Sequence, residues 1–476
     1  MNKIIKKSLA VAFVLVTAWG CKISQPAIKA ENTSVPETYN QEKQFGQSEI
    51  PVWKEVFTDS NLIALIDTAL SHNQELNILL QEISIANNEI QARKGEYLPF
   101  VNIQGGGGID KVGRYTRDGV VEANHEIKEG KEFPEPLSDV MVGAFASWEL
   151  DVWKKLRNAK KSAVFKYLST VEGKNFMVTQ LVAEIAGSYY ELMALDNQLS
   201  ILEQNIQIQK NALEIVKMQK QAAKVTELAV KRFEAEVAKN QSLIYDIRQQ
   251  ITETENRINF LVGRFPQPIQ RNSAAFPDLV PNAIQSGLPS QLLANRPDIR
   301  QAELDLEAAK LDVKVAKANF YPQFRLTAGM GFQAFNPRYL LTTPESLIYS
   351  VAGDLVAPLV NKNAIKANYR SASAQQIQAV YNYERSILNG YIEVTNQLSK
   401  INNLDKSYAL KSQQVAALTE SISISNNLFK SARADYMEVL LTQRDALESK
   451  MELVETKMMQ LNALVHVYQA LGGGWN

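Results

Sequence analysis

The chain has 476 residues, with 51 lysines and arginines against 51 aspartates and glutamates, and a single cysteine. Its first 20 residues contain three lysines and no acid, so a chain that loses this segment has a formal charge of about −3. A nucleic-acid-binding protein shows a basic surplus, and this class is excluded. No run of about 18 apolar residues follows residue 20, so no membrane-spanning helix is expected.

The N-terminus has the features of an export signal. Three lysines precede a short apolar run at 9–16, small residues follow, and then comes Cys21. This order predicts a signal peptide over 1–20. The tetrapeptide 18–21, Ala-Trp-Gly-Cys, resembles a bacterial lipobox, in which the cysteine becomes acylated, although tryptophan is unusual at its second position. The alternative is an incidental thiol, but a lone cysteine at the cleavage site favours a lipid (palmitate-type) anchor, followed by a polar linker over 21–52.

Proline spacing and apolar periodicity predict very long helices. No proline occurs between Pro136 and Pro266, or after Pro358, and proline interrupts helices. If 152–219 forms one helix, it is about 100 Å long at about 1.5 Å per residue, which requires a tube or rod. Heptad spacing, which indicates helices packed side by side, occurs in both halves of the chain. In the first half it involves Leu181, Ile185, Leu192, Leu195, Leu199, Leu202 and Ile206; in the second, Ile387, Tyr391, Val394, Leu398 and Ile401.

The two halves of the chain resemble each other. A helical stretch, two strand-like segments, a long helix, a turn and a second long helix are expected twice. The strand-like segments are 98–109 and 139–150 in the first half and 321–332 and 346–357 in the second. The turns also match, as AAKVTELAV against SARADYMEV. We therefore expect a first repeat over 53–265, a linker over 266–290 and a second repeat over 291–476.

The four strand-like segments alternate with period two, as membrane-spanning strands do. Phe100, Asn102 and Gln104 fall on one side of the first segment, and Val101 and Ile103 on the other. Four strands cannot close a barrel of useful bore, and lipid does not tolerate open edges, so a membrane barrel requires oligomerisation. The alternative is an ordinary antiparallel sheet that caps a helical bundle. The export signal and the long helices favour the barrel.

Five motifs carry a resemblance to a known family. Residues 293–303 read LANRPDIRQAE, which resembles LxxRPDIRxAE of the TolC-like outer-membrane efflux family. Residues 316–322, 148–153, 261–264 and 470–475 resemble further elements of that family, although Trp153 and Lys154 depart from its Phe-Gly. The resemblance covers 53–476 and favours the lipoprotein (NodT-type) branch that serves resistance-nodulation-division (RND) pumps.

The resemblance implies a mainly helical trimer with a small membrane β-barrel. Three chains would contribute twelve strands to one barrel in the outer membrane of a Gram-negative bacterium. That barrel would continue into a long α-helical barrel that extends into the periplasm. The partners implied are a periplasmic adaptor and an inner-membrane RND transporter. The function implied is passive efflux of drugs or other small toxic compounds, with no cofactor, no metal and no enzymatic activity.

The resemblance also directs attention to the two hairpin tips. A ring of carboxylates at the periplasmic constriction is expected from Glu438, with apolar collars from Met437 and Leu441. An acidic residue is absent at 441, where relatives have one, and the alternative for Glu438 is an ordinary exposed turn residue. In the first half, the corresponding tip predicts an adaptor contact at Thr226, Glu227 and Leu228. The motif Arg296-Pro297-Asp298 is interpreted as a helix start.

Other classes remain as alternatives. A type I secretion duct uses the same architecture, and a lipid-anchored periplasmic scaffold also uses long hairpins but lacks the duplicated strand pair. An enzyme is disfavoured because the three histidines, His72, His125 and His466, are isolated in the sequence, and no phosphate-binding loop follows the glycine run at 105–108.

Overall fold

A computed structural model describes residues 27–39, 50–279, 287–431 and 433–475. The predicted signal peptide, Cys21 and part of each predicted linker lie outside these residues. The chain divides into two compact units. We name them the strand unit (Met1–Ala30, Arg93–Ser162 and Ala309–Val380) and the helical unit (Glu31–Ala92, Ala163–Ala308 and Tyr381–Asn476), and each is described on its own.

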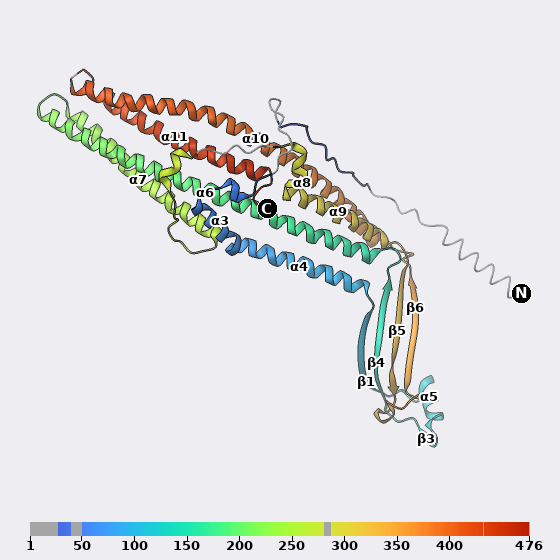
Figure 1. Ribbon diagram of the computed structural model, residues 1–476. Helices are drawn as coiled ribbons and strands as arrows, with labels where there is room; N and C mark the ends of the chain where they lie inside the picture. Colours follow the sequence, from blue (N-terminus) through green and yellow to red (C-terminus); the bar gives the residue numbers. More distant parts are fainter. Residues whose placement is uncertain (1–26, 40–49, 280–286, 432, 476) are drawn as a thin grey trace. The chain divides into compact units, whose positions relative to one another are not determined.

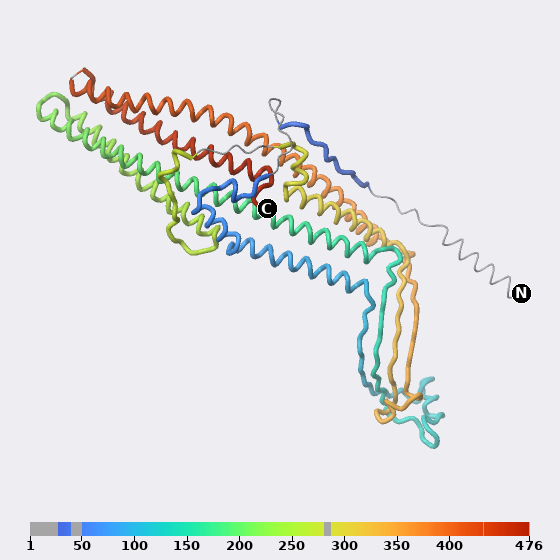
Figure 2. Tube along the Cα trace, in the orientation of Figure 1, coloured from blue at the N-terminus to red at the C-terminus, as the bar shows by residue number. Residues whose placement is uncertain are grey.

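The long elements follow the predicted order, and Figures 1 and 2 trace them along the chain. The first set is α4 (Gln74–Tyr97), β1 (Phe100–Asp110), β4 (Leu137–Leu150), α6 (Lys155–Gln221) and α7 (Glu227–Val262). The second set is α9 (Pro297–Ala318), β5 (Gln323–Ala334), β6 (Leu347–Val356), α10 (Asn363–Lys430) and α11 (Tyr436–Ala470). The predicted long helices and four strands are confirmed, with ends displaced by a few residues.

The short elements are largely those that the sequence does not predict. They are α2 (Trp53–Val56), α3 (Ser60–His72), α5 (Arg117–Asn124), β2 (Glu126–Lys128), β3 (Lys131–Glu132), η1 (Ser273–Asp278), η2 (Pro289–Gln291), α8 (Leu292–Asn295) and η3 (Pro337–Tyr339). Of these, α3 matters most for packing, since Leu62, Ile66 and Ala69 have no exposed surface.

The strand unit contains one four-stranded antiparallel sheet in the order β1-β4-β5-β6. Its register is continuous, for example from Asn102 opposite Phe145 to Phe145 opposite Gly329. The pairing leaves β1 and β6 as the two edges of this sheet. Trp148 at the end of β4 donates its indole N–H to the carbonyl of Tyr97 at 3.0 Å, which fixes the end of α4 beside the sheet.

The core of the helical unit gathers apolar side chains of α3, α6, α7 and α11. The start of α3 is fixed by Asp59, whose side chain accepts hydrogen bonds from the backbone N–H of Asn61 and Leu62 at 2.8 and 3.3 Å. The same carboxylate accepts from the Tyr189 hydroxyl of α6 at 2.9 Å. One residue therefore caps α3 and ties it to α6.

The signature Arg296-Pro297-Asp298 starts α9, as predicted, and also joins three helices. Arg296 is buried and forms a two-pronged ion pair with Asp298, with N···O distances of 3.0 and 2.7 Å. It also donates to Glu393 of α10 at 2.7 Å and to the carbonyl of Ala470 at the end of α11 at 2.8 Å. Burial acts to lower the pKa of Arg296, but Asp298 and Glu393 outweigh it, so the pKa is raised and the side chain stays charged.

The chain after α11 is packed into the same region. Gly472 has a φ of +90°, and a Cβ there would collide with the backbone of Asn295. Only glycine adopts this positive φ without strain and has no Cβ to collide with Asn295. Farther along the signature, Arg300 and Glu303 form the predicted i,i+3 pair at 2.5 Å and are partly exposed. The signature therefore acts structurally, by closing α9, α10 and α11 on one another.

Candidate functional site

The two hairpin tips have the same backbone turn. In the first, the N–H of Lys224 donates to the carbonyl of Gln219 at 2.9 Å; in the second, Arg433 donates to Leu428, also at 2.9 Å. Both bonds run from a residue to the fifth residue before it, which closes a helix C-terminus. The return helices also begin alike, since Ala229 and Glu438 each donate to the carbonyl three residues earlier, at 3.1 Å.

The first tip exposes the three residues predicted to contact an adaptor. Thr226, Glu227 and Leu228 are all exposed, Leu228 to 57 %. Glu227 is paired with Lys220, and the ammonium of Lys231 lies at 3.9 Å from it. The hydrogen bond from Lys220 lowers the pKa of Glu227. The tip therefore presents an exposed leucine beside a paired carboxylate.

The second tip differs in its cap. Asp435 accepts a hydrogen bond from the N–H of Tyr436 at 2.6 Å, whereas Thr226, its counterpart, makes no side-chain cap bond. Carboxylate caps are favoured at helix N-termini because they satisfy free N–H groups and complement the helix dipole.

The structure separates the three predicted gate residues. Glu438 and Leu441 are exposed and lie three residues apart, on one face of the first turns of α11. Met437 is half-buried, and its sulfur accepts a hydrogen bond from Arg232 of α7 at 3.3 Å. Within one chain, Met437 thus contacts the first hairpin, while Glu438 and Leu441 are the pair left exposed.

An apolar cluster, here named the tip cluster, holds the two tips together. Its buried members come from α6 and α7: Leu213, Val216, Ala229, Val230, Phe233 and Val237. Partly buried Phe429, Tyr436 and Leu440 of the second hairpin pack against them. The tips of both hairpins therefore form a single packed end of the helical unit.

The sheet of the strand unit has two chemically different faces, because successive residues of a strand alternate between faces. In the observed register, one face carries Val101, Ile103, Val140, Val142, Leu326, Met330, Tyr349 and Val351. The opposite face carries the polar residues Asn102, Gln104, Asp139, Glu149, Arg325, Thr327, Ser350 and Asp354, together with the apolar residues Phe100, Met141, Phe145, Ile348 and Val356. The apolar face is widely exposed, with Ile103 at 82 % and Val351 at 83 %. An exposed apolar face of this extent marks a lipid or protein contact.

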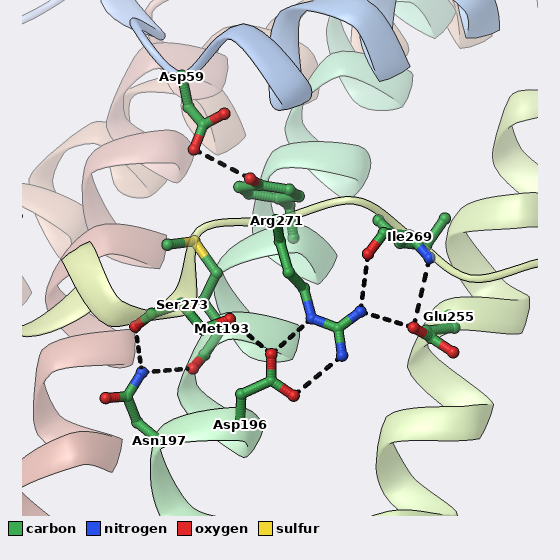
Figure 3. Close-up of polar contacts among 9 residues, drawn as sticks. Asp59, Met193, Asp196, Asn197, Glu255, Ile269, Arg271 and Ser273 are labelled. Atoms are coloured by element: carbon green, nitrogen blue, oxygen red, sulfur yellow. Dashed lines mark hydrogen bonds and ion pairs between the residues drawn. The ribbon is translucent and has the colours of Figure 1, made fainter. Parts of the chain in front are cut away.

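A clamp centred on Arg271 holds the segment that follows α7 (Figure 3). The guanidinium pairs with Asp196 of α6 at 2.6 and 2.9 Å and with Glu255 of α7 at 2.6 Å. The Ser273 hydroxyl donates to the same Asp196 at 2.5 Å. Nearby, the Asn197 amide donates to the carbonyl of Ser273 at 2.7 Å. These bonds fix the segment across α6 and α7, near the end of the first hairpin that lies away from its tip.

The clamp stays charged. Burial acts to lower the pKa of Arg271, but the hydrogen bonds to Asp196 and Glu255 outweigh it, so the pKa is raised. Sequence reasoning missed this cluster because the partners lie 75 and 16 residues from Arg271, and no local pattern marks them.

None of the helices in the described part of the chain is long and apolar enough to cross a membrane. Among the same residues, no three histidine, cysteine, aspartate or glutamate side chains are grouped so that they could hold a metal ion.

The strand unit thus contributes a two-faced antiparallel sheet, and the chain continues from its strands into two long helical hairpins. The family model for outer membrane efflux proteins matches residues 65–264 and 288–473, so the chain belongs to that family. The membership predicted from the motifs is confirmed.

Individual relatives are distant but match over most of their length. The chain is 26 % identical to the solvent efflux pump outer membrane protein SrpC of Pseudomonas putida, over 90 % of this chain and 88 % of that protein. It is 22 % identical to SilC of Salmonella typhimurium, described as a probable outer membrane lipoprotein, over 98 % of this chain and 99 % of SilC. A solved structure of CusC has the same fold, with a TM-score of 0.81, 23 % identity, and coverage of 94 % of this chain and 99 % of that one.

The Arg271 clamp leads to a prediction about stability. Replacing Arg271 by methionine removes the cation that pairs with Asp196 and Glu255, and should destabilise the helical unit by about 1.5–3 kcal/mol. We expect a lower melting temperature and faster proteolytic cleavage between residues 264 and 279. Arg248→Met is the control, because Arg248 is paired with Glu203 at 3.3 Å on the surface, where such a pair contributes less than about 1 kcal/mol. Equal effects of the two substitutions would contradict the clamp.

Proposed function

We propose that the protein is the outer-membrane exit channel of a tripartite RND-type efflux pump. It would conduct drugs or other small toxic compounds passively, as a duct and not an enzyme, while the partner pump supplies the energy. The observation that carries the proposal is the two-faced sheet with two open edges, joined in sequence to paired hairpins. Relatives described as solvent and cation efflux proteins support the substrate class of small toxic compounds.

The open edges support a trimer. In the described part of the chain, β1 and β6 each pair on one side only. Unpaired backbone groups are not tolerated in the hydrocarbon core of a membrane, so each edge needs a partner strand. Joining β1 of one copy to β6 of the next would close twelve strands from three copies. The apolar face would then meet lipid, and the polar face would line the bore.

Two repeats, over 53–265 and 291–476 with a linker at 266–290, form part of the proposal. The order of helix, two strands and two long helices occurs twice, and the family model matches in two stretches, residues 65–264 and 288–473. The equivalent turns of the two tips add support, because they use the same backbone hydrogen bonds.

Lipid attachment at Cys21 is proposed from its position in the sequence and from the likeness to SilC. The first described residues after Cys21 are hydrogen-bonded to α10. The carbonyls of Ala27 and Lys29 accept hydrogen bonds from Ser373 and Gln376 of α10, at 2.6 and 2.9 Å. An anchor at Cys21 would therefore be joined to the folded protein by only a short segment.

The packed end of the helical unit is the proposed gate and adaptor-contact region. Glu438 would form a ring of three carboxylates under threefold symmetry, with Leu441 as an apolar collar one turn away. Met437 would support the ring through its contact with Arg232 instead of lining it. Thr226, Glu227 and Leu228 would meet a periplasmic adaptor.

Single-channel conductance in planar bilayers tests the channel and its gate. The purified trimer should give a small, stable conductance, and Glu438→Ala should raise it because the charge ring is removed. Glu448→Ala is the matched control, since Glu448 is exposed on α11 ten residues from Glu438. A trimer that never conducts would contradict the channel and favour a non-conducting periplasmic scaffold. Equal conductance of Glu438→Ala and the parent would contradict the gate.

Adaptor contact at the first tip predicts a separable defect. Leu228→Asp places a charge on the exposed apolar residue of the tip, and should reduce efflux in cells at least about tenfold, because an apolar contact of about 1.4 kcal/mol or more is lost. Conductance and the heat stability of the trimer should not change. Normal efflux by Leu228→Asp would place the adaptor contact elsewhere.

Lipidation is tested by the mass of the mature N-terminal peptide. The parent protein should carry acyl chains on Cys21, and Cys21→Ser should lose them. An unmodified cysteine in the mature protein, or a chain that begins at another residue, would contradict the anchor.

A further inference from the structure

Four carboxamide side chains are buried near the tips, and we name them the amide layer: Asn205 and Gln209 of α6, Asn240 of α7 and Gln443 of α11. Their exposed fractions are 7, 0, 1 and 1 %. Surface helices usually bury apolar residues at such positions, and amides are mostly exposed. Their burial on three helices therefore requires an explanation.

The amide layer lies at one level of the helical unit. On one side of it is the tip cluster, which includes Leu213, Val237 and Leu440. On the other side is a second apolar cluster, here named the shaft cluster, which is formed by Leu195, Leu202, Ile206, Ile247 and Leu447. Gln209, Asn240 and Gln443 lie between the residues of the tip cluster and those of the shaft cluster along α6, α7 and α11, respectively. Asn205 lies one turn farther along α6, beside Ile206 of the shaft cluster.

The hydrogen bonds of this layer are incomplete. The Asn240 amide donates to the Gln209 carbonyl oxygen at 2.8 Å, which confirms that α6 and α7 meet at this level. The Gln209 amide nitrogen, the Asn205 amide oxygen and both polar atoms of Gln443 are buried without a hydrogen-bond partner among the described residues. A partly satisfied polar layer is weaker than either an apolar core or a fully bonded network.

The helices are easier to separate at the amide layer than at either apolar cluster. Separating the helices at an apolar cluster exposes apolar surface to water, which is unfavourable. Separating them at the amide layer gives water to groups that lack partners, which offsets the loss. The bundle is therefore easiest to part at Gln443, where α11 of the second hairpin meets α6 and α7 of the first.

We propose that the amide layer is a hinge, at which the tips part while the shaft cluster stays packed. The tips carry Glu438 and Leu228, so the hinge would set how easily the end of the channel opens. The effect of the hinge on channel opening rests on the proposed function. The independent opening of the tips and the shaft does not depend on that function.

Hydrogen exchange measured by mass spectrometry on the detergent-solubilised trimer tests the hinge. Backbone amides of 213–237 and 429–440 should exchange together, and faster than those of 195–206, 244–251 and 447–451. Gln443→Leu joins the two apolar clusters and removes two unsatisfied groups, so exchange at the tips should slow about tenfold with the shaft unchanged. Gln443→Met, which keeps the unbranched shape, should act in the same direction.

Gln241→Leu is the matched control. Gln241 is exposed on α7 beside Asn240, so the same chemical change there should leave tip exchange as in the parent. Equal exchange of tip and shaft in the parent trimer would overturn the hinge. So would unchanged or faster tip exchange in both Gln443 variants.

Single-channel conductance distinguishes a failure of the hinge proposal from a failure of the proposed function. Gln443→Leu should shorten the open time of a conducting trimer severalfold, and an unchanged open time would contradict the hinge. A trimer that never conducts contradicts the proposed function, and the exchange rates then decide the hinge on their own.

Discussion

The packing of α6 against α3, α7 and α11 is the interaction on which the helical unit depends. Tyr189 and Leu192 of α6 have no exposed surface, and around them lie Leu62 of α3, Ile258 of α7 and Val465 of α11. Heptad-spaced apolar residues make this possible, because they keep one stripe of a long helix facing its neighbours. Burial of this stripe holds α7 and α11 along α6, and the tip cluster then joins the two hairpins at their ends.

Polar groups then decide how the packed helices are ordered. Arg296 joins α9, α10 and α11 through Asp298, Glu393 and the carbonyl of Ala470. Arg271 fixes the segment after α7 to α6 and α7. Each arginine is charged and paired with two carboxylates, so it is costly to separate from them. The amide layer is the opposite case, because its groups are buried and largely unpaired. The helical unit thus contains two strong polar contacts, centred on Arg296 and Arg271, and one weak polar contact, the amide layer.

The sequence predicted the elements well because their patterns are local. Period-two alternation located β1, β4, β5 and β6, and proline-free heptads located α6 and α10. The helix start at Pro297 was also predicted, since proline and an acidic residue favour a first turn. The other partners of Arg296 were not, because Glu393 and Ala470 lie 97 and 174 residues away.

The candidate site was predicted only in part for the same reason. Thr226, Glu227, Leu228, Glu438 and Leu441 are exposed at the tips, where turn patterns placed them. Met437 and Arg232 lie 205 residues apart in the sequence, so no local pattern predicts their contact. From the sequence, Gln209, Asn240 and Gln443 are expected to be exposed to solvent, because amide side chains usually are. Only the arrangement of the helices shows that they are buried.

The end of α11 has a consequence for the order of folding. Tyr468 donates to the carbonyl of Pro51 at 2.8 Å and packs edge-on against Phe57, with ring centroids 6.0 Å apart. Residues 471–474 are buried, and Gly474 lies against Thr179 and Val182 of α6. The core around α3 and α6 is therefore completed by residues 417 positions after Pro51, so the parts of the chain that are made first cannot finish packing until α11 has been made. A chain that stops before Tyr468 lacks the residues that complete the core, and apolar side chains such as Phe57 then stay exposed to water.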